Sequence, residues 1–441
     1  MRPVGKGGGE NCISVRLLER RSGSFICDKA HKAMNRTTET AVCIIVENLP
    51  VPLDRRVWKE ACALRDAGYR VSVICPKGKG HTTSYETLDG IEIYRHKTWE
   101  ASRKLEYFLE YGWALIAEFL LALRVFARTR FSILQACNPP DNIFLIGLFF
   151  RLFGVRFIFD QHDLGPELFE AKFGNHAGTL YKLACLLERC SYRVANTCIT
   201  TNESFREIAI ARGGKDPKSV FVVRNCPDLD KFRRPQIQTP NKFGREFLVA
   251  YVGFMGSQDG LDILLDSIEH IVKHDHRTDT HFLLIGGGSM LPELQAIVAE
   301  KNLSGFVTLT GQVTHSEVAA YLASADLGVA PDPKNAMNDI STMIKIFEYM
   351  AFELPVVLFD LKEGRRTAGP AALYAVPNDP IDFANRITEL LDSSALRQQL
   401  GECGRKRIEE NLNWQVEKLT LLRAYESAAQ SGRVLRELRT Q

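Results

Sequence analysis

Three polar side chains recur at helical spacing in the second half of the chain. Thr342, Lys345 and Glu348 stand at positions i, i+3 and i+6 of a helix predicted over residues 341–352, so they share roughly one face. A hydroxyl, an ammonium and a carboxylate on one face could bind a diphosphate and ribose hydroxyls together. Ser341 or Thr342 is the predicted N-cap, which would aim backbone N–H donors at the same ligand. The alternative is an ordinary Lys–Glu pair on a solvated helix face.

Glycine-rich loops follow two predicted strands of the same half. Residues 286–288 come after the strand 281–285, and residues 253–260 join another strand to a helix. Glycine lets a ligand come close to the backbone, and the free N–H groups at a helix start attract anions. The two loops therefore favour phosphate binding, with plain tight turns as the alternative.

A histidine flanked by carboxylates ends a predicted strand in the first half. The strand 157–160 runs directly into His162 and Asp163. A histidine at the carboxyl end of a strand could hold a hydrogen bond or move a proton; a loop histidine without a function is the alternative. A second polar loop, over residues 47–56, is expected to border the cleft between the two halves.

The elements that position these loops alternate between short apolar strands and helices from residue 41 onward. Such alternation predicts an α/β protein with parallel sheets covered on both faces. Ligands bind beyond the carboxyl ends of such strands, so two Rossmann-like domains would face each other across a cleft. The predicted parts are a tail at 1–40, domains at 41–235 and 244–413, a helix at 414–428 that crosses back to the first domain, and a tail at 429–441.

Composition excludes several classes of protein. The 441 residues are 45% apolar, and 56 basic against 53 acidic side chains leave a net charge of +3. A disordered or collagen-like chain is excluded, and no concentrated basic charge points to nucleic acid. The 11 cysteines include no C-x-x-C pair, which favours free thiols in a reducing, cytoplasmic setting.

An aromatic and basic segment at 104–130 could contact a membrane. Its apolar core, residues 111–127, is interrupted by Glu118 and Arg124, so a spanning helix is not expected. A helix lying in the membrane interface and an ordinary core helix remain alternatives.

Taken together, these features resemble family 4 of the GT-B glycosyltransferases, the retaining, nucleotide-sugar-dependent group. In the first half, the similarity to a bacterial polysaccharide-assembly subgroup and to the family's histidine loop rests on residues 47–60, 68–76 and 161–167. In the second half, the family's order of motifs is matched by residues 251–253, 285–288, 311–313 and 348–357.

The resemblance implies a role for each candidate residue. His162, Glu348 and Lys345 would be catalytic. His162 would hydrogen-bond the donor sugar or the reacting centre, Glu348 would bind the ribose hydroxyls, and Lys345 would stabilise the charge of the diphosphate. The implied donor-binding residues are Gly253, Gly256, Asp259, Gly260, Gly286, Gly287, Gly288, Val313, Asp339, Ser341 and Thr342. The implied acceptor-side residues are Glu47, Asn48, Asp54, Arg55, Arg56 and Asp163.

The chain departs from the family's pattern in two places. The family usually carries two glutamates eight residues apart, and here Glu348 matches the second while Ile340 holds the first position. Asp339 or Ser341 could take over that role. The loop 254–260 also lacks the Arg and Lys that the family uses to hold the diphosphate, which leaves Lys345 as the substitute.

The implied reaction is retaining transfer of a sugar from a nucleoside diphosphate sugar, with uridine diphosphate as the expected carrier, to a glycan or lipid-linked acceptor. We expect no tightly bound cofactor, no metal and no nucleic-acid partner. The expected location is the cytoplasm. A further expectation is peripheral contact with the inner face of the plasma membrane through residues 104–130. A nucleotide-sugar epimerase on the same fold and a non-catalytic scaffold of a membrane polysaccharide assembly remain alternatives.

Overall fold

The computed structural model describes residues 40–78, 80–97, 104–173, 178–230, 234–236 and 240–437. The predicted tail at 1–40 lies outside this description apart from residue 40, and so do residues 438–441. The chain divides into two compact units, Met1–Gln135 with Phe149–Arg156, and Ala136–Leu148 with Phe157–Gln441. The limits of these two units differ from the predicted domain limits. The domain limits therefore remain a prediction.

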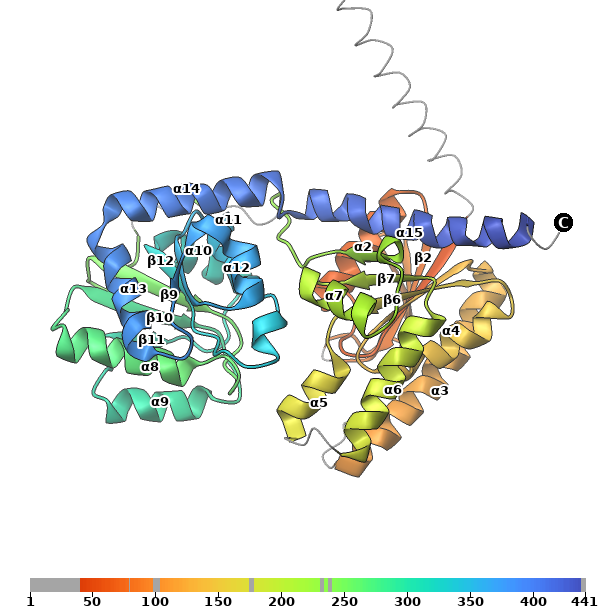
Figure 1. The fold of residues 1–441 in the computed structure, drawn as a ribbon, viewed down its shortest axis with the longest axis horizontal. Helices are drawn as coiled ribbons and strands as arrows, with labels where there is room; N and C mark the ends of the chain where they lie inside the picture. Colours follow the sequence, from red (N-terminus) through yellow and green to blue (C-terminus); the bar gives the residue numbers. More distant parts are fainter. Residues whose placement is uncertain are drawn as a thin grey trace, which may run out of the picture. The chain divides into compact units, whose positions relative to one another are not determined.

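The strands form two sheets (Figure 1), of eight strands in the order β3-β4-β2-β1-β5-β6-β7-β8 and of six in the order β11-β10-β9-β12-β13-β14. In the first sheet the strands are β1 (Ala41–Val46), β2 (Arg70–Pro76), β3 (Tyr85–Leu88), β4 (Ile91–His96), β5 (Ile133–Cys137), β6 (Arg156–Gln161), β7 (Thr197–Thr200) and β8 (Val220–Val222). In the second they are β9 (Phe247–Val252), β10 (Thr280–Ile285), β11 (Val307–Leu309), β12 (Leu327–Ala330), β13 (Val356–Phe359) and β14 (Ala372–Ala375).

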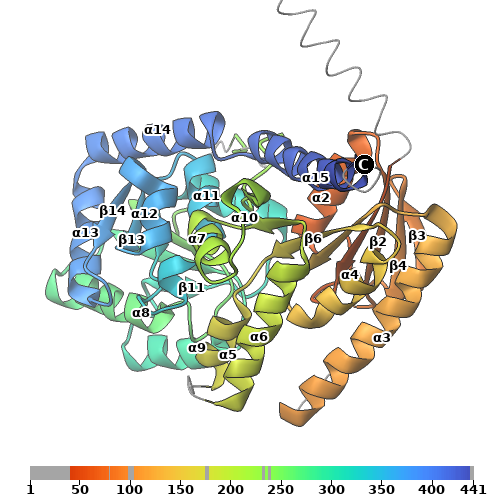
Figure 2. The same cartoon turned by 45° about the vertical axis from the view of Figure 1, so that its right-hand side comes forward.

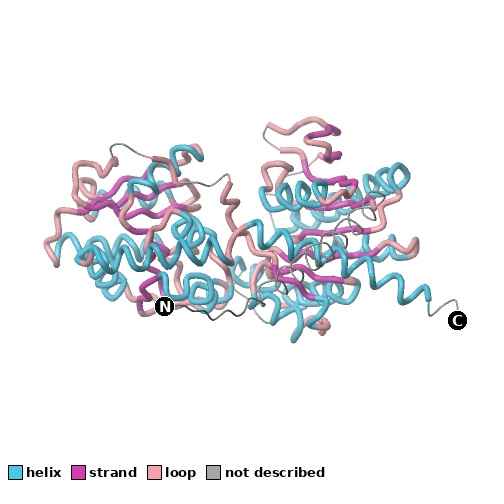
Figure 3. Tube along the Cα trace, turned by 90° about the horizontal axis from the view of Figure 1, so that it is seen from above, coloured by secondary structure: helices cyan, strands magenta, loops and turns pink. Residues whose placement is uncertain are grey.

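Helices accompany both sheets, as the cyan helices around the magenta strands show in Figure 3. The helices of the first half are α2 (Arg55–Asp66), α3 (Lys104–Thr129), α4 (Phe144–Arg151), α5 (Gly165–Phe173), α6 (Thr179–Val194) and α7 (Glu203–Ala211). Those of the second half are α8 (Leu261–Glu269), α9 (Leu291–Glu300), α10 (His315–Ser324), α11 (Ile344–Ala351), α12 (Lys362–Ala368), α13 (Pro380–Asp392), α14 (Ser394–Glu410) and α15 (Trp414–Glu437).

In the first unit, strand β1 is apolar along its whole length. All six residues of β1 are buried, and β1 pairs in parallel with β2, which pairs in parallel with β4. A strand covered on both faces needs no polar alternation, which is why the run 41–46 is continuously apolar. Helix α2 begins where the Asp54 carboxylate accepts from the Val57 N–H at 3.0 Å.

In the second unit, β9 sends alternate side chains to two different cores. Val249 and Tyr251 pack with α8, α9 and α13, while Leu248, Ala250 and Val252 pack with α11. This period of two is what a parallel strand between two helical layers requires. The fold is therefore α/β with two parallel-sheet domains, as predicted.

The C-terminal helix returns to the first sheet. The Trp414 N–H donates to the Pro227 carbonyl at 3.0 Å, and the Arg224 N–H donates to the Glu417 carboxylate at 3.0 Å. Helix α15 contacts β7 and β8. The predicted crossing helix is thus confirmed, but it continues to Glu437 instead of ending at 428.

Two further sequence expectations concern the thiols and the membrane. Nine cysteines fall among the described residues, and none of the nine is in a disulfide. Within the same residues, no helix combines the length and the apolarity that crossing a membrane requires.

Candidate active site

The entry to helix α11 differs from its prediction. The Ser341 hydroxyl donates to the Met337 carbonyl at 2.7 Å, across the short 3-10 turn Asn338–Ile340. Met343 holds the N-cap position, and its side chain makes no capping hydrogen bond. The predicted cap by Ser341 or Thr342 is therefore wrong, and the N-cap residue provides no side-chain acceptor for the positive end of the helix.

Lys345 is buried between two carboxylates. Its Nζ lies 2.8 Å from Asp332 Oδ1 and 3.7 Å from Asp259 Oδ1, and 4.8 Å above the Tyr251 ring centroid. Burial lowers the pKa of Lys345, but the two carboxylates outweigh it and hold the pKa above its usual value. The ammonium is charged, and its charge is already shared by two acids.

Asp332 and Tyr251 were missed by sequence reasoning. Asp332 comes directly after β12, between two prolines, and its side chain is almost fully buried. The available indication was its place at the carboxyl end of a strand. Burial also raises the pKa of Asp259, although Lys345 opposes that shift.

Thr342 and Glu348 do not share the environment of Lys345. Thr342 precedes the helix, so the predicted face of three residues holds only for Lys345 and Glu348. The Thr342 Oγ1 is buried and has no hydrogen-bond partner within the described structure. Glu348 is half-buried.

The two glycine-rich loops touch each other. The Gly253 N–H donates to the Ile285 carbonyl at 3.0 Å, and the Met255 N–H donates to the Gly287 carbonyl at 3.1 Å. A Cβ at Gly286 would collide with the Gly253 carbonyl oxygen, and one at Gly288 with the Met255 carbonyl oxygen. Glycine is needed at both positions because the backbone of one loop packs directly against the backbone of the other.

The remaining predicted donor residues support the loops around α11. Asp259 Oδ2 accepts from the Gly256 N–H at 3.0 Å. Gly260 precedes α8 at φ 67°, where a Cβ would meet the Pro331 carbonyl oxygen. Asp339 Oδ1 accepts from the Lys362 N–H at 3.0 Å, and Val313 packs against the apolar core.

The His162 loop is held by two side chains that the sequence did not single out. His162 Nε2 lies 2.8 Å from Asp160 Oδ2. Asn138 Oδ1 accepts from the His162 N–H at 2.7 Å and from the Asp163 N–H at 3.2 Å, while Asn138 Nδ2 donates to the Asp163 carbonyl at 2.8 Å. Burial raises the pKa of Asp163, opposed by His162.

A cavity of about 200 Å³ in the second unit is lined by predicted site residues from both halves of the chain. It is lined by His162, Asp163, Thr201, Phe205, Asn225, Ser341, Thr342 and Ile344. Its surroundings are fixed by Asn202 Nδ2, which donates to the Ile340 carbonyl at 2.9 Å, and by the Ser204 N–H, which donates to the Glu363 carboxylate at 2.9 Å. The last contact joins α7 to α12, and Figure 2 labels both helices.

The predicted acceptor residues of the 47–56 loop belong to the first unit, and most are engaged. Asp54 caps α2, and Arg56 pairs with Glu60 at 3.2 Å. Asn48 and Arg55 are exposed. Glu47 is buried beside Glu118, and burial, together with the charge of Glu47, raises the pKa of Glu118 well above its usual value.

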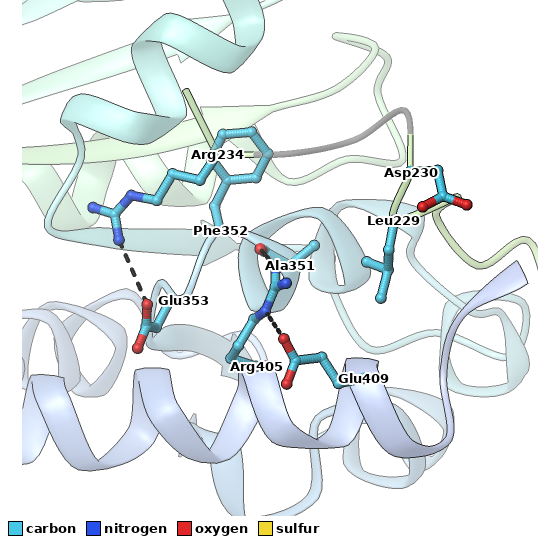
Figure 4. A pocket seen from close by; sticks show the side chains of 8 residues that line it. All are labelled: Leu229, Asp230, Arg234, Ala351, Phe352, Glu353, Arg405 and Glu409. Atoms are coloured by element: carbon cyan, nitrogen blue, oxygen red, sulfur yellow. Dashed lines mark hydrogen bonds and ion pairs between the residues drawn. The ribbon is translucent and has the colours of Figure 1, made fainter. Parts of the chain in front are cut away.

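A larger cavity of about 650 Å³ lies elsewhere in the second unit and is shown in Figure 4. No predicted site residue lines it. Its charged groups satisfy one another: Arg405 contacts Glu409 at 2.7 Å and the Ala351 carbonyl at 2.6 Å, and Arg234 lies 3.9 Å from Glu353.

Comparison with known proteins defines the family. Residues 53–226 match the model described as "Glycosyl transferase 4-like domain", and residues 246–393 match "Glycosyl transferases group 1". Together these matches cover most of the described chain. The chain belongs to the family 4-like glycosyltransferases of GT-B fold.

Individual relatives are distant. An uncharacterized glycosyltransferase of Methanocaldococcus jannaschii is 29% identical over 40% of this chain and 47% of its own length. The poly(ribitol-phosphate) alpha-N-acetylglucosaminyltransferase of Staphylococcus aureus is 25% identical over 44% of this chain and 37% of its own. The matched part of this chain thus spans less than half the length of these two curated relatives.

Solved structures agree on the fold. Sucrose-phosphate synthase from Thermosynechococcus elongatus superposes with a TM-score of 0.70 at 19% identity, over 91% of this chain and 99% of that one. Anabaena HepE, solved in complex with UDP, gives 0.64 at 12% identity, over 88% and 100%.

The loop contact predicts a stability difference between two glycines. Gly286→Ala should lower the free energy of unfolding by about 3 kcal/mol, because the new Cβ collides with the Gly253 carbonyl oxygen. Gly305→Ala is the matched control, since a Cβ there meets nothing within 4 Å. Urea unfolding of both variants measures the difference, and equal stabilities would contradict the loop contact.

Proposed function

We propose that this protein is a retaining glycosyltransferase. It moves a sugar from a nucleoside diphosphate sugar, UDP-linked by analogy with the UDP complex of HepE, to a glycan or lipid-linked acceptor. The observation that carries the proposal is the cavity that His162 shares with Thr342 at the start of α11. The proposed domain limits remain 41–235 on the acceptor side and 244–413 on the donor side.

The donor diphosphate would bind at the start of α11. The uncapped first turn offers backbone N–H donors, and the unpartnered Thr342 hydroxyl beside it offers one more. Glu348, on the same helix, would accept hydrogen bonds from the ribose hydroxyls. We invoke no metal at this position, since the helix end supplies partial positive charge toward the diphosphate.

Lys345 acts here through its surroundings. With Asp332 and Asp259 beside it, the cluster of three carries a net charge of −1. An incoming diphosphate competes with these acids for the ammonium, which limits how tightly the product nucleotide is held. Lys345 thereby stabilises the charge that develops as the diphosphate leaves.

His162 would contact the donor sugar from the other side of the cavity. Asp160 holds its Nε2 at 2.8 Å, and Asn138 holds its backbone N–H. The family mechanism uses no dedicated protein nucleophile, so the histidine needs a fixed direction more than reactivity. Asp160 is a positioning residue in this scheme.

Membrane contact is proposed for helix α3. Trp113, Ile116 and Leu120 are 54–59% exposed and recur on one face of the helix. Leu152 and Phe153 in the same unit are exposed as well. An apolar face of this kind fits a lipid surface and a lipid-linked acceptor, and it would place the protein at the inner face of the plasma membrane.

Removing the donor contacts tests the proposal directly. Lys345→Ala and Glu348→Ala should each lower sugar transfer about 100-fold, because charge stabilisation and ribose binding are lost. Transfer of labelled sugar from a panel of nucleotide sugars is the measurement, and Glu410→Ala, on the exposed end of α14, is the control. Wild-type rates in both variants would overturn the assignment. Epimerised free nucleotide sugar in the absence of acceptor would instead support an epimerase.

Asp160→Asn should separate positioning from binding. The variant keeps the shape of the side chain but removes the carboxylate opposite His162, so we expect kcat to fall about 10- to 100-fold with an unchanged KM for the donor. Steady-state kinetics over a range of pH measures this. An equal rise in KM, or an unchanged kcat and pH profile, would contradict the positioning role.

Membrane contact predicts a difference between two exposed apolar surfaces. Ile116→Glu with Leu120→Glu should abolish co-flotation with anionic liposomes, because both charges would enter the apolar layer. Leu419→Glu on α15, which is 61% exposed, is the control and should float like the wild type. A wild-type protein that stays at the bottom of the gradient would refute the contact.

A further inference from the structure

The first unit buries a second polar cluster, outside the cavity of the proposed site. Glu47 follows β1, His96 ends β4, and Glu118 lies in the middle of α3. One ligand-type atom from each side chain lies within 4.8 Å of the other two. None of the three residues is more than 9% exposed, and Glu118 is fully buried.

The polar atoms of this cluster are unsatisfied. His96 Nε2 and Glu47 Oε2 lie 2.9 Å apart, yet neither makes a hydrogen bond of acceptable geometry. Both carboxylate oxygens of Glu118 also lack a hydrogen-bond donor, and among the described residues no lysine or arginine pairs with either acid. Two acids buried side by side carry a desolvation cost that a proton or a bound cation must offset.

The histidine is oriented like a ligand. His96 Nδ1 lies 3.3 Å from the Lys97 carbonyl, so the ring hydrogen on Nδ1 points at that oxygen. The lone pair of Nε2 then faces the two carboxylates. A histidine that donates one ring hydrogen to a carbonyl while its other nitrogen faces acceptors is the usual arrangement around a protein-bound metal.

We propose that Glu47, His96 and Glu118 bind one divalent transition-metal cation, Zn²⁺ or Mn²⁺. One imidazole and two carboxylates are ligands that both ions accept, and three protein ligands leave further coordination positions open. The cation offsets the two acidic charges and gives all three side chains a partner. This site is separate from the proposed donor site, where no metal is invoked.

The proposed cation joins α3 to the sheet. Its ligands come from the ends of β1 and β4 and from the buried side of the helix whose opposite face is apolar and exposed. It also fixes Glu47, the first residue of the loop that leads to α2. The metal would therefore order the predicted acceptor loop.

Metal titration of the tag-free full chain tests the proposal. After removal of metal with chelator, ZnCl₂ or MnCl₂ alone is titrated by calorimetry, and bound metal is counted by elemental analysis. We expect one equivalent per chain in the wild type and at least 100-fold weaker binding in Glu118→Gln. Glu110→Gln, the same change two turns earlier on α3, is the control and should bind like the wild type.

A second readout keeps the test decisive if Glu118→Gln folds poorly. The same metal should raise the thermal unfolding midpoint of the wild type by several degrees and leave that of His96→Gln unchanged. No metal uptake by the wild type, or equal uptake by the wild type and both variants, would overturn the site and leave protons as the bridge between the acids. Both measurements omit nucleotide sugar, so they stand apart from any failure of sugar transfer.

Discussion

The buried ammonium of Lys345 holds together the elements at the carboxyl edge of the second sheet. Asp332 follows β12, Asp259 precedes α8, Tyr251 belongs to β9, and all three surround one charge on α11. A lysine buried this deeply stays charged only if acids are packed against it. Its pairing therefore fixes where β12 and α8 present their loops, and the proposed donor site is built on that arrangement.

The histidine side of the cavity is organised by backbone contacts. Asn138 binds both N–H groups of the His162–Asp163 turn, so a side chain from β5's end sets the direction of the next strand's loop. Ile340 stands where the family usually has a glutamate, and its carbonyl accepts from Asn202. The backbone carbonyl of residue 340 thus links the two sides of the cavity. A residue of any type could make this contact.

Local pattern predicted the strands well because burial on both faces leaves a continuous apolar run, as in 41–46. It also predicted which loop carries His162 and which helix carries Lys345, since carboxyl ends of parallel strands share an edge. It could not find the partners: Asp332 is 13 residues from Lys345, and Glu118 is 71 from Glu47. The prediction of Ser341 as an N-cap was wrong for a related reason. A rule for helix ends cannot predict that the Ser341 hydroxyl donates to the Met337 carbonyl in the preceding turn.

Helix α15 makes the order of synthesis matter. Strands β7 and β8 are contacted by this helix, whose first residue is Trp414, and all six strands of the second sheet lie between them in the sequence. A ribosome must therefore synthesise the whole second sheet before β7 and β8 gain their cover. Until then the outer part of the first sheet is exposed to other proteins, which is the stage at which partly folded chains aggregate. The helix that completes the first sheet is thus made only after the second sheet.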